Sequence, residues 1–475
     1  MAALPIQAHV GSPDVYYEAD AGPYHLFVTV QIPQVIPGVA KIQVRADSND
    51  VRTISVVPMR LSGPGSELSP IPDVVHPSKQ DAQLFAASLW LMESGALRVH
   101  ITVDGARGRG ELSVPVPAFA RRTLSMRKTL GGVLLVLTLF LAVGLVQIII
   151  AAVRDSGLEP GETPATATLH GARLAAALTA VVVVAILYLG NLWWNAEASS
   201  HGRDVTFYRP PAAVATVQNG DRLVIHAQGP AGEERKWSRE VNTNRLLPDH
   251  GHLMHLFLIS VPTMDCILHL HPEHIGNGNF AIDLPAMPAG KYQIFADIVD
   301  QNGFPWTLVG TVDLPAISGG PLAGDDSSWS GPAALSSPGN FVSELSDGGR
   351  MVWERSSSPL RAQAPMEFKF AVQDRDGHPV SDLEPYMGMA GHAEFVRTDF
   401  SVFAHVHPAG SVSMAALELA QNDMPGMMSM PEISRSLSSE VSFPYGFPQP
   451  GDYRIFVQVK RVGRVQTGVF DVHVE

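Results

Sequence analysis

Two long uncharged segments near the middle of the chain restrict its fold more than any other feature. The first, TLGGVLLVLTLFLAVGLVQIIIAAV at residues 129–153, has no charge and a single amide side chain. The second, LAAALTAVVVVAILYLGNLWW at 174–194, is also uncharged and ends in two tryptophans. Each exceeds the ~20 residues that a helix needs to cross ~30 Å of hydrocarbon, and tryptophan is typical of the membrane interface. The sequence therefore predicts a two-helix transmembrane hairpin, with the globular regions before and after it in one compartment.

The charges around this hairpin and the start of the chain give opposite indications of its orientation. Four basic residues precede the first span and two flank the connecting loop: Arg121, Arg122, Arg127 and Lys128, against Arg154 and Arg173. The positive-inside rule would place the globular regions in the cytoplasm. However, MAALPIQA before His9 is similar to the end of a secretory signal peptide, and a cleaved signal fixes the N-terminal domain outside. We therefore expect a two-span protein of the bacterial inner (cytoplasmic) membrane, with its globular domains on the periplasmic or extracellular side.

Short alternating segments separated by Gly and Pro indicate that the rest of the chain consists of β-strands. YHLFVTVQI from Tyr24 and ALRVHITVDGARGRGELSVPV from Ala96 are examples, and the second contains an Asp104-Gly105 turn signal. A chain of 475 residues has room for about three domains of ~150 residues. The sequence thus predicts a mainly β fold with three immunoglobulin-like β-sandwich domains plus the transmembrane hairpin. The expected bounds are 9–118 for the first domain, 205–317 for a His-rich second domain, 318–340 for a flexible Ser/Gly/Pro-rich linker and 341–475 for the third domain.

The second and third domains repeat each other in sequence. Alignment of HLHP at 269–272 with HVHP at 405–408 brings His255 opposite His392, with one residue of slip. The same alignment matches three further features: Gly290 and Tyr292 with Gly451 and Tyr453, and the His250-x-His252 pair with Met387-x-Met389. The third domain also contains an insertion with the sequence MPGMMSM at 424–430.

Histidines concentrate in this repeat in a pattern suited to metal binding. Residues i and i+2 of a strand face the same way, so His269 and His271 can present two imidazoles to one point, and His255 can supply a third. Imidazole binds copper, zinc, nickel and iron, whereas the soft thioether of methionine selects Cu(I). The candidate ligands are His250, His252, His255, His269, His271, Met387, Met389, His392, His405 and His407.

Copper is the expected metal because seven of the 16 methionines lie between Met387 and Met430. The second domain should then prefer Cu(II) and the third Cu(I). The metal affinity of the imidazoles in the second domain should fall as the pH drops below their reference pKa of ~6.5. If cleavage follows Ala8, the amine and imidazole of His9 could also chelate Cu(II). The alternative remains open that the histidines are hydrogen-bonded structural groups and the methionines fill the core.

Several other functions find no support in the sequence. The net charge of −13 and a pI near 5.7 give no electrostatic footprint for nucleic acid. A single cysteine, Cys266, excludes an intramolecular disulfide framework and any CxxC motif. No nucleophile elbow, phosphate-binding loop or HExxH helix is present, so we expect no enzymatic activity.

The residues of the repeat also carry a family resemblance. The GH…HLF…HLHP…GKYxxFAD pattern of the second domain resembles the small β-sandwich modules of the YtkA-like family. The AHVGSPDV start is similar to CopC-type periplasmic copper-binding proteins, which begin at a histidine after signal removal. The resemblance covers the second domain, the third through the repeat, and the first loosely. It implies an immunoglobulin-like fold and a role in copper handling or in the maturation of respiratory complexes.

The sequence thus indicates a membrane-anchored, envelope-facing metal-binding protein that binds or delivers copper. Its expected partners are the lipid bilayer and other membrane or periplasmic proteins. The alternative is a non-catalytic structural or accessory subunit of a membrane complex, whose β domains serve as interaction surfaces.

Overall fold

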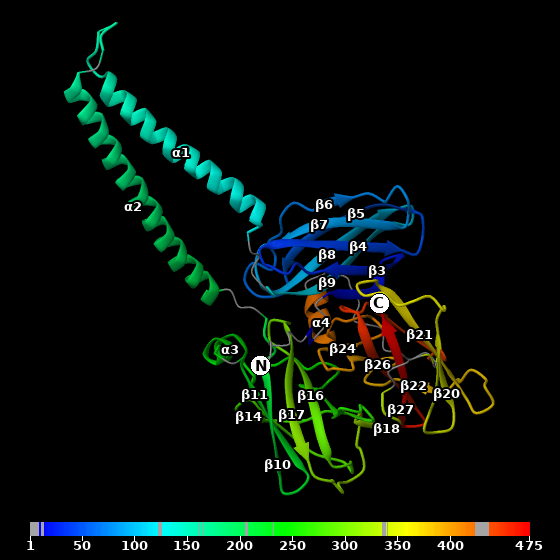
Figure 1. Ribbon diagram of the computed structural model, residues 1–475. Coiled ribbons are helices and arrows are strands. Elements are labelled where there is room, and N and C mark those ends of the chain that lie inside the picture. Colours follow the sequence, from blue (N-terminus) through cyan, green and yellow to red (C-terminus); the bar gives the residue numbers. More distant parts are fainter. Residues whose placement is uncertain are drawn as a thin grey trace. The chain divides into compact units, whose positions relative to one another are not determined.

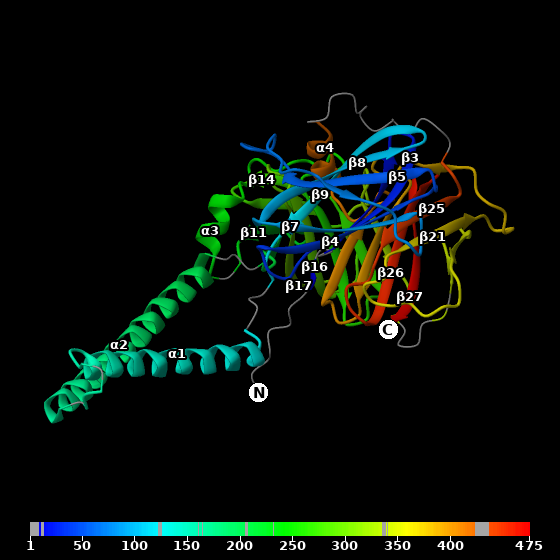
Figure 2. The same ribbon diagram turned by 90° about the horizontal axis from the view of Figure 1, so that it is seen from above.

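The computed structural model describes residues 9–10, 14–121, 126–159, 161–163, 165–204, 208–230, 232–334, 339, 341–422 and 437–475. The chain divides into two compact units, one of strands (Met1–Phe119 with Arg209–Glu475) and one of helices (Ala120–Tyr208) (Figures 1 and 2). The fold is mainly β, as predicted, with strands in several sheets. The signal-like residues 1–8 and the methionine-rich insertion at 424–430 lie outside the described residues.

The helical unit is an antiparallel hairpin of α1 (Lys128–Asp155) and α2 (Thr166–Asp204). Lys128–Asp155 and Thr166–Ser199 are long and apolar enough to cross a membrane, which agrees with the predicted hairpin. Their apolar side chains are largely exposed, as expected of residues that contact lipid rather than a protein core. The second helix starts before and ends after the apolar stretch at 174–194.

The first β domain consists of two four-stranded antiparallel sheets. Side chains alternate along these strands: in β4 (Gly38–Ala46) those of Ala40, Ile42 and Val44 are buried while those of Lys41 and Arg45 are exposed. The hairpin of β8 (Gly95–Gly105) and β9 (Gly108–Ala118) turns just after the predicted Asp104-Gly105 signal, since Gly105 pairs with Gly108. One sheet contains β2 (Val15–Ala21), β3 (Tyr24–Gln31), β4 (Gly38–Ala46) and β7 (Leu84–Leu91), and the other contains β6 (Asp73–Val75), β5 (Val51–Arg60), β8 (Gly95–Gly105) and β9 (Gly108–Ala118).

The second β domain is a single nine-stranded sheet that curls around its own core. Ile225 and Phe280, near one end of the sheet, share a hydrophobic cluster with Leu268, near the other end. A short helix, α3 (Glu234–Glu240), contributes Trp237 to the same cluster. The strand order is β14 (Glu273–Gly276), β15 (Asn279–Asp283), β11 (Arg222–Gln228), β10 (Ala212–Gln218), β17 (Pro305–Leu314), β16 (Gly290–Val299), β12 (His255–Val261), β13 (Cys266–Leu270) and β18 (Ser327–Ser330).

The edge strand β18 lies inside the segment that the sequence analysis assigned to a flexible linker. Its backbone pairs with β13, with Ser327 opposite His269 and Ser330 opposite Cys266. This part of the linker is therefore ordered as sheet, because β13 would otherwise expose an unpaired edge.

The third β domain packs a six-stranded sheet on a four-stranded one around an aromatic core that includes Trp353, Phe368 and Phe395. The larger sheet contains β24 (Val402–Val406), β23 (His392–Arg397), β26 (Gly451–Arg461), β22 (Leu383–Glu384) and β27 (Arg464–Val474). The two-residue strand β1 (His9–Val10) forms the edge of this sheet next to β24. It pairs in parallel with β24 rather than with the first domain. The smaller sheet contains β19 (Val342–Glu344), β20 (Arg350–Glu354), β21 (Met366–Gln373) and β25 (Glu440–Tyr445), and helix α4 (Met414–Asn422) follows β24.

Two structural details match between the second and third domains where their sequences align. The Asp249–His252 and Tyr386–Met389 segments form the same tight turn, with positive φ at both central residues in each case. The hydroxyl of Tyr292 donates to the carbonyl of Pro288 at 2.8 Å, and that of Tyr453 donates to the carbonyl of Gln449 at 2.8 Å. Such a tyrosine corner is typical of immunoglobulin-like domains.

The two repeated domains are joined by a shared apolar cluster. Phe295 of β16 stacks on Phe403 of β24 with ring centroids 4.2 Å apart, and Phe257 contacts the same ring. The cluster also contains Met264, from the turn after β12, and Phe456 of β26. Because these side chains are completely buried, the two domains form one folded body in which strands β12, β13, β23 and β24 lie at a common interface.

Candidate metal centre

Eight histidines gather at the interface between the second and third domains. They come from the four strands just named and from the turns beside them, and neighbouring rings have centroids between 3.9 and 6.2 Å apart. All eight are among the predicted ligands: His250, His252, His255, His269, His271, His392, His405 and His407. Six of their side chains are nearly or completely buried, and sets of three bring a nitrogen of each ring within 4.8 Å of the others.

The first trio, His255, His269 and His271, lies within the second domain, as the alternation of β13 predicts. Nδ1 of His255 and Nε2 of His269 are 3.2 Å apart. Two nitrogens bound to one tetrahedral ion at 2.0–2.1 Å lie about 3.3 Å from each other. The observed separation is therefore the one that a shared metal ion would require.

The outer nitrogen of each ring in this trio faces an oxygen acceptor. Nε2 of His255 donates to the backbone carbonyl of Asp249 at 3.0 Å. Nδ1 of His269 faces Oε1 of Gln458 at 3.0 Å, and Nδ1 of His271 faces a carboxylate oxygen of Asp326 at 3.0 Å. Each bond fixes the tautomer, because the acceptor needs the single proton that a neutral imidazole carries. The three inner nitrogens are consequently lone pairs.

Lone pairs in such close contact repel each other unless a cation lies between them. Nδ1 of His255 and Nε2 of His269 cannot hydrogen-bond to one another as neutral rings, because neither has a proton left to donate. Nε2 of His271 is buried and has no hydrogen-bond partner among the described residues. With its outer hydrogen bonds in place, this donor set could hold a metal ion.

A second trio, His250, His392 and His407, takes one ring from the second domain and two from the third. Nε2 of His250 and Nε2 of His407 are 3.3 Å apart. Nδ1 of His407 donates to the carbonyl of Val412 at 3.1 Å, so its Nε2 is also a lone pair. Both ring nitrogens of His392 are buried without a hydrogen-bond partner among the described residues.

The sequence alignment grouped His392, His405 and His407, and the structure arranges these three differently. His405 stands between the two trios, with its ring centroid 5.4 Å from that of His255 and 5.3 Å from that of His392. Its Nδ1 is 3.5 Å from a carboxylate oxygen of Asp297, and its Nε2 is buried with no partner among the described residues. His250, contributed by the other domain, completes the trio in its place because the two domains dock face to face.

Burial keeps the imidazoles neutral. It lowers the pKa of His250 to about 2 and that of His405 and His407 to about 3, with neighbouring imidazoles as a secondary cause. For the same reasons the pKa values of His255, His269 and His392 lie well below their ordinary value. Their lone pairs are thus available to a metal throughout the physiological pH range.

Three carboxyl groups border the histidines: Asp249 and Glu394 are buried, and the Asp297 side chain is partly exposed. Burial raises the pKa of Asp249 and of Asp297 to about 7 and raises the pKa of Glu394 well above its ordinary value. Both carboxyl oxygens of Glu394 lack a hydrogen-bond partner among the described residues, and one lies 3.9 Å from Nδ1 of His269. These groups can ionise when a cation enters, which would balance its charge in a buried site.

The remaining predicted ligands lie outside both trios. His252 stacks on His271 with ring centroids 3.9 Å apart, is partly exposed, and directs Nε2 towards Asp325 at 3.8 Å. Met387 and Met389 are buried in the turn that corresponds to the one containing His250 and His252.

The outer hydrogen-bonding residues were not predicted from the sequence. Asp326 comes from the segment expected to be a flexible linker, and Gln458 comes from the other domain. One signal was available: Gln458 and Asp297 occupy the same position after the aligned Gly-x-Tyr motifs, and each faces a histidine of the opposite domain.

The first domain supports the loop that follows His407. The backbone nitrogen of Ser411 donates to the carbonyl of Tyr16 at 2.9 Å, and that of Glu18 donates to the carbonyl of Ala409 at 2.8 Å. Gly410, with φ at +132°, permits this approach, because an added Cβ would lie 1.9 Å from the Tyr16 carbonyl oxygen. This packing holds the loop whose Val412 carbonyl orients His407.

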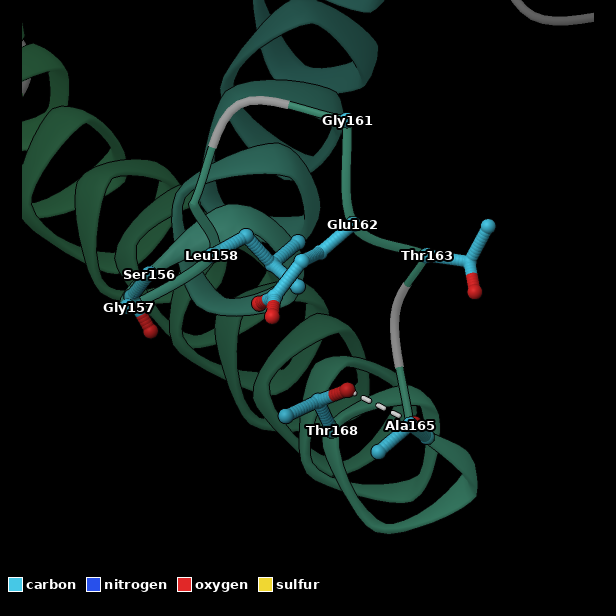
Figure 3. A pocket seen from close by; sticks show the side chains of 8 residues that line it. All are labelled: Ser156, Gly157, Leu158, Gly161, Glu162, Thr163, Ala165 and Thr168. Carbon is cyan, nitrogen blue, oxygen red and sulfur yellow. Dashed lines mark hydrogen bonds between the residues drawn. The ribbon is translucent and has the colours of Figure 1, made fainter.

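A separate pocket lies in the connection between α1 and α2 (Figure 3). It is lined by Ser156, Gly157, Leu158, Gly161, Glu162, Thr163, Ala165 and Thr168, and the Thr168 hydroxyl donates to the Ala165 carbonyl at 2.7 Å. Its single ionisable side chain, Glu162, offers no grouping of ligands comparable to the histidine trios.

Comparison with known proteins gives one family match. A family described as a domain of unknown function, DUF8832, matches residues 344–475, which is the third domain. No curated protein matches the chain.

Solved structures with some likeness have TM-scores too low to support a shared fold. Salmonella alpha-2-macroglobulin reacted with methylamine is 9% identical with a TM-score of 0.19, and the match covers 100% of this chain but only 24% of the other. A putative membrane anchored protein from Corynebacterium diphtheriae is 10% identical with a TM-score of 0.16, covering 97% of this chain and 94% of that one. The chain therefore spans about a quarter of the length of the macroglobulin that it matches.

Proposed function

We propose that this protein binds copper through His255, His269 and His271 and serves as a membrane-anchored copper-binding or copper-delivery protein. The observation that supports the proposal is the 3.2 Å contact between Nδ1 of His255 and Nε2 of His269, each of which has its outer nitrogen committed to an oxygen. If the two histidines had a purely structural role, two lone pairs would face each other in a buried site without a hydrogen bond, which would destabilise the folded state.

The chemistry of the ligands supports copper among the metals that bind imidazole. For nitrogen ligands, Cu²⁺ binds most tightly of the divalent first-row ions, and three neutral imidazoles also suit a monovalent ion. A monovalent ion costs less to bury among neutral ligands than a divalent one, because the desolvation penalty grows with the square of the charge. Copper is the metal of this group that offers both oxidation states.

The surrounding architecture fits a role in the cell envelope. The three β domains are proposed to be immunoglobulin-like, on the basis of the paired sheets of the first and third domains and the two tyrosine corners. Helices α1 and α2 would anchor them in the inner membrane on the periplasmic side, where other membrane or periplasmic proteins would receive or supply the metal.

The metal assignment is tested with His269→Gln in the purified full chain. The protein is stripped with chelators, loaded with Cu(I), Cu(II) or Zn(II), desalted, and its metal content measured. We expect the unaltered protein to retain copper and the variant to lose the ion of this trio, with an affinity loss larger than the roughly 10–100-fold that follows removal of an outer hydrogen bond.

His226→Gln is the matched control, because His226 is an exposed histidine of the same domain. It should leave copper binding unchanged. A protein that retains no metal after loading would overturn the proposal in favour of a structural subunit, and stronger retention of zinc than of copper would overturn the choice of copper.

The orientation is tested by fusing a reporter that is active only in the cytoplasm to Glu475. Since two spans return the chain to its starting side, we expect little reporter activity if the β domains are periplasmic. A fusion in the α1–α2 connection, for example after Gly161, is the control and should be active. The reverse pattern would place the β domains in the cytoplasm, as the basic residues before α1 suggest.

A further inference from the structure

The second trio is built in the same way as the first. In both, two ring nitrogens approach each other to within 3.2–3.3 Å, and at least one of them has its outer nitrogen bound to a backbone carbonyl. Nε2 of His407 is therefore a lone pair, and it faces Nε2 of His250 at 3.3 Å.

His392 provides an independent indication that this trio binds a ligand. It is completely buried, and neither of its ring nitrogens has a hydrogen-bond partner among the described residues. Burying an imidazole with both nitrogens unsatisfied is unfavourable, because each nitrogen loses its hydrogen bonds to water without a replacement. The ring lies 5.1 Å from both the His250 ring and the His407 ring, centroid to centroid. Coordination of an ion between the three rings would satisfy one of these two nitrogens.

We propose that His250, His392 and His407 hold a second transition-metal ion, so that the interface contains a two-ion centre, and that this second ion joins the two domains. Because His250 belongs to the second domain and the other two ligands to the third, the ion cannot bind fully unless the domains are docked. This inference extends the proposed function, since it takes the same class of metal at a separate set of ligands.

Occupancy of this site should also stabilise the docked arrangement. The Asp249–His252 turn contacts the third domain through a further bond, from the backbone nitrogen of Ala415 in α4 to the Asp249 carboxyl at 3.1 Å. A ligand that binds only the folded, docked state stabilises it in proportion to the logarithm of its concentration over its dissociation constant. Metal binding at this trio should therefore raise the temperature at which the domain pair unfolds.

The test compares His250→Gln with His252→Gln in the full chain loaded with copper. Both substitutions lie in the same turn, but His252 is outside both trios and directs its nitrogen towards Asp325. We expect two copper ions per chain in the unaltered protein and in His252→Gln, and one in His250→Gln. The rise in unfolding temperature on copper loading should be smaller in His250→Gln than in the control.

His269→Gln separates this inference from the proposed function. It should retain the one ion of the second trio, and the double variant His250→Gln/His269→Gln should retain none. A stoichiometry of one that His250→Gln leaves unchanged would overturn the second site while leaving the first intact. Equal losses in His250→Gln and His252→Gln would show that the turn, and not the His250 ligand, accounts for the effect, and would overturn it as well.

Discussion

Acidification from pH 7 to pH 5 should destabilise the metal-free protein by several kcal/mol. Buried site imidazoles have pKa values far below the ~6.5 of the unfolded chain, so the folded state binds fewer protons than the unfolded state below that pH. Their contribution to stability is complete above pH ~6.5 and is lost as the pH falls towards their folded values. Below pH ~6.5, each such group lowers the free energy of unfolding by about 1.4 kcal/mol for every pH unit of acidification.

The carboxyls that border the histidines act in the opposite direction but are fewer. Because their pKa values are raised, these carboxyls keep their protons in the folded state between pH ~3.9 and about 7, where the unfolded state has released them. The stability that they contribute is therefore lost as the pH rises through this range. Seven site imidazoles have lowered pKa values, against three raised carboxyls: His250, His252, His255, His269, His392, His405 and His407, against Asp249, Asp297 and Glu394. The net effect is a stability maximum near pH 6.5–7 and a steep fall on the acid side.

Denaturant unfolding, followed by tryptophan fluorescence between pH 5 and pH 7.5, measures this slope. His392→Phe removes one buried imidazole and should reduce the slope by about 1.4 kcal/mol per pH unit. His473→Gln, at an exposed position, is the control and should change the free energy of unfolding by under ~1 kcal/mol. Copper loading should raise the free energy of unfolding without flattening the curve, because coordinated nitrogens, like the buried neutral ones, take up no protons while those of the unfolded chain still do. Equal stability of the metal-free protein at pH 5 and pH 7 would contradict the burial of neutral histidines.

From the sequence, metal affinity is expected to fall below pH ~6.5, the reference pKa of imidazole. The lowered pKa values of the buried ligands move this expected fall to a lower pH. The reference pKa applies to an exposed imidazole, and no local pattern in HLHP or HVHP reveals that both motifs face another domain. Burial arises from docking, so it could not be read from the segments themselves. Direct competition between protons and metal should consequently begin well below pH 6.5 in the folded protein.

The predictable part of the centre is the part that local geometry decides. The alternation of a strand brings His269 and His271 to one side, and the repeat identifies His405 and His407 as their counterparts. The trio that includes His250 could not be predicted, because it combines residues 142 and 157 positions away in the chain through an interface that depends on Phe257, Phe295 and Phe403.

The same interface affects how the expected division between Cu(II) and Cu(I) can be examined. Comparing isolated second and third domains would expose the shared apolar cluster and divide the second trio. The oxidation-state preference is therefore better tested in the full chain, with substitutions that remove one trio at a time.

Arg454→Met should be the most destabilising single substitution at this interface, with a cost of about 3–5 kcal/mol. The Arg454 guanidinium is 2% exposed and binds both carboxylate oxygens of Asp471 at 2.7 Å. It also donates to the carbonyls of Met264 and Pro332, each at 2.8 Å, and so connects β26 to the second domain and to the segment after β18. Methionine would fill much of the space but leave a buried carboxylate and two carbonyls without this donor.

Denaturant unfolding of the full chain gives the size of the loss, and two further variants give its cause. Arg222→Met, which removes an exposed ion pair with Asp283, should cost under ~1 kcal/mol. Arg454→Met/Asp471→Leu should recover part of the stability, because it removes the uncompensated carboxylate. A cost for Arg454→Met no larger than that of Arg222→Met would show that the guanidinium does not hold the interface.

Because only the second trio draws ligands from both domains, loosening the interface should affect the two trios unequally. It should lower metal affinity at His250, His392 and His407 more than at His255, His269 and His271.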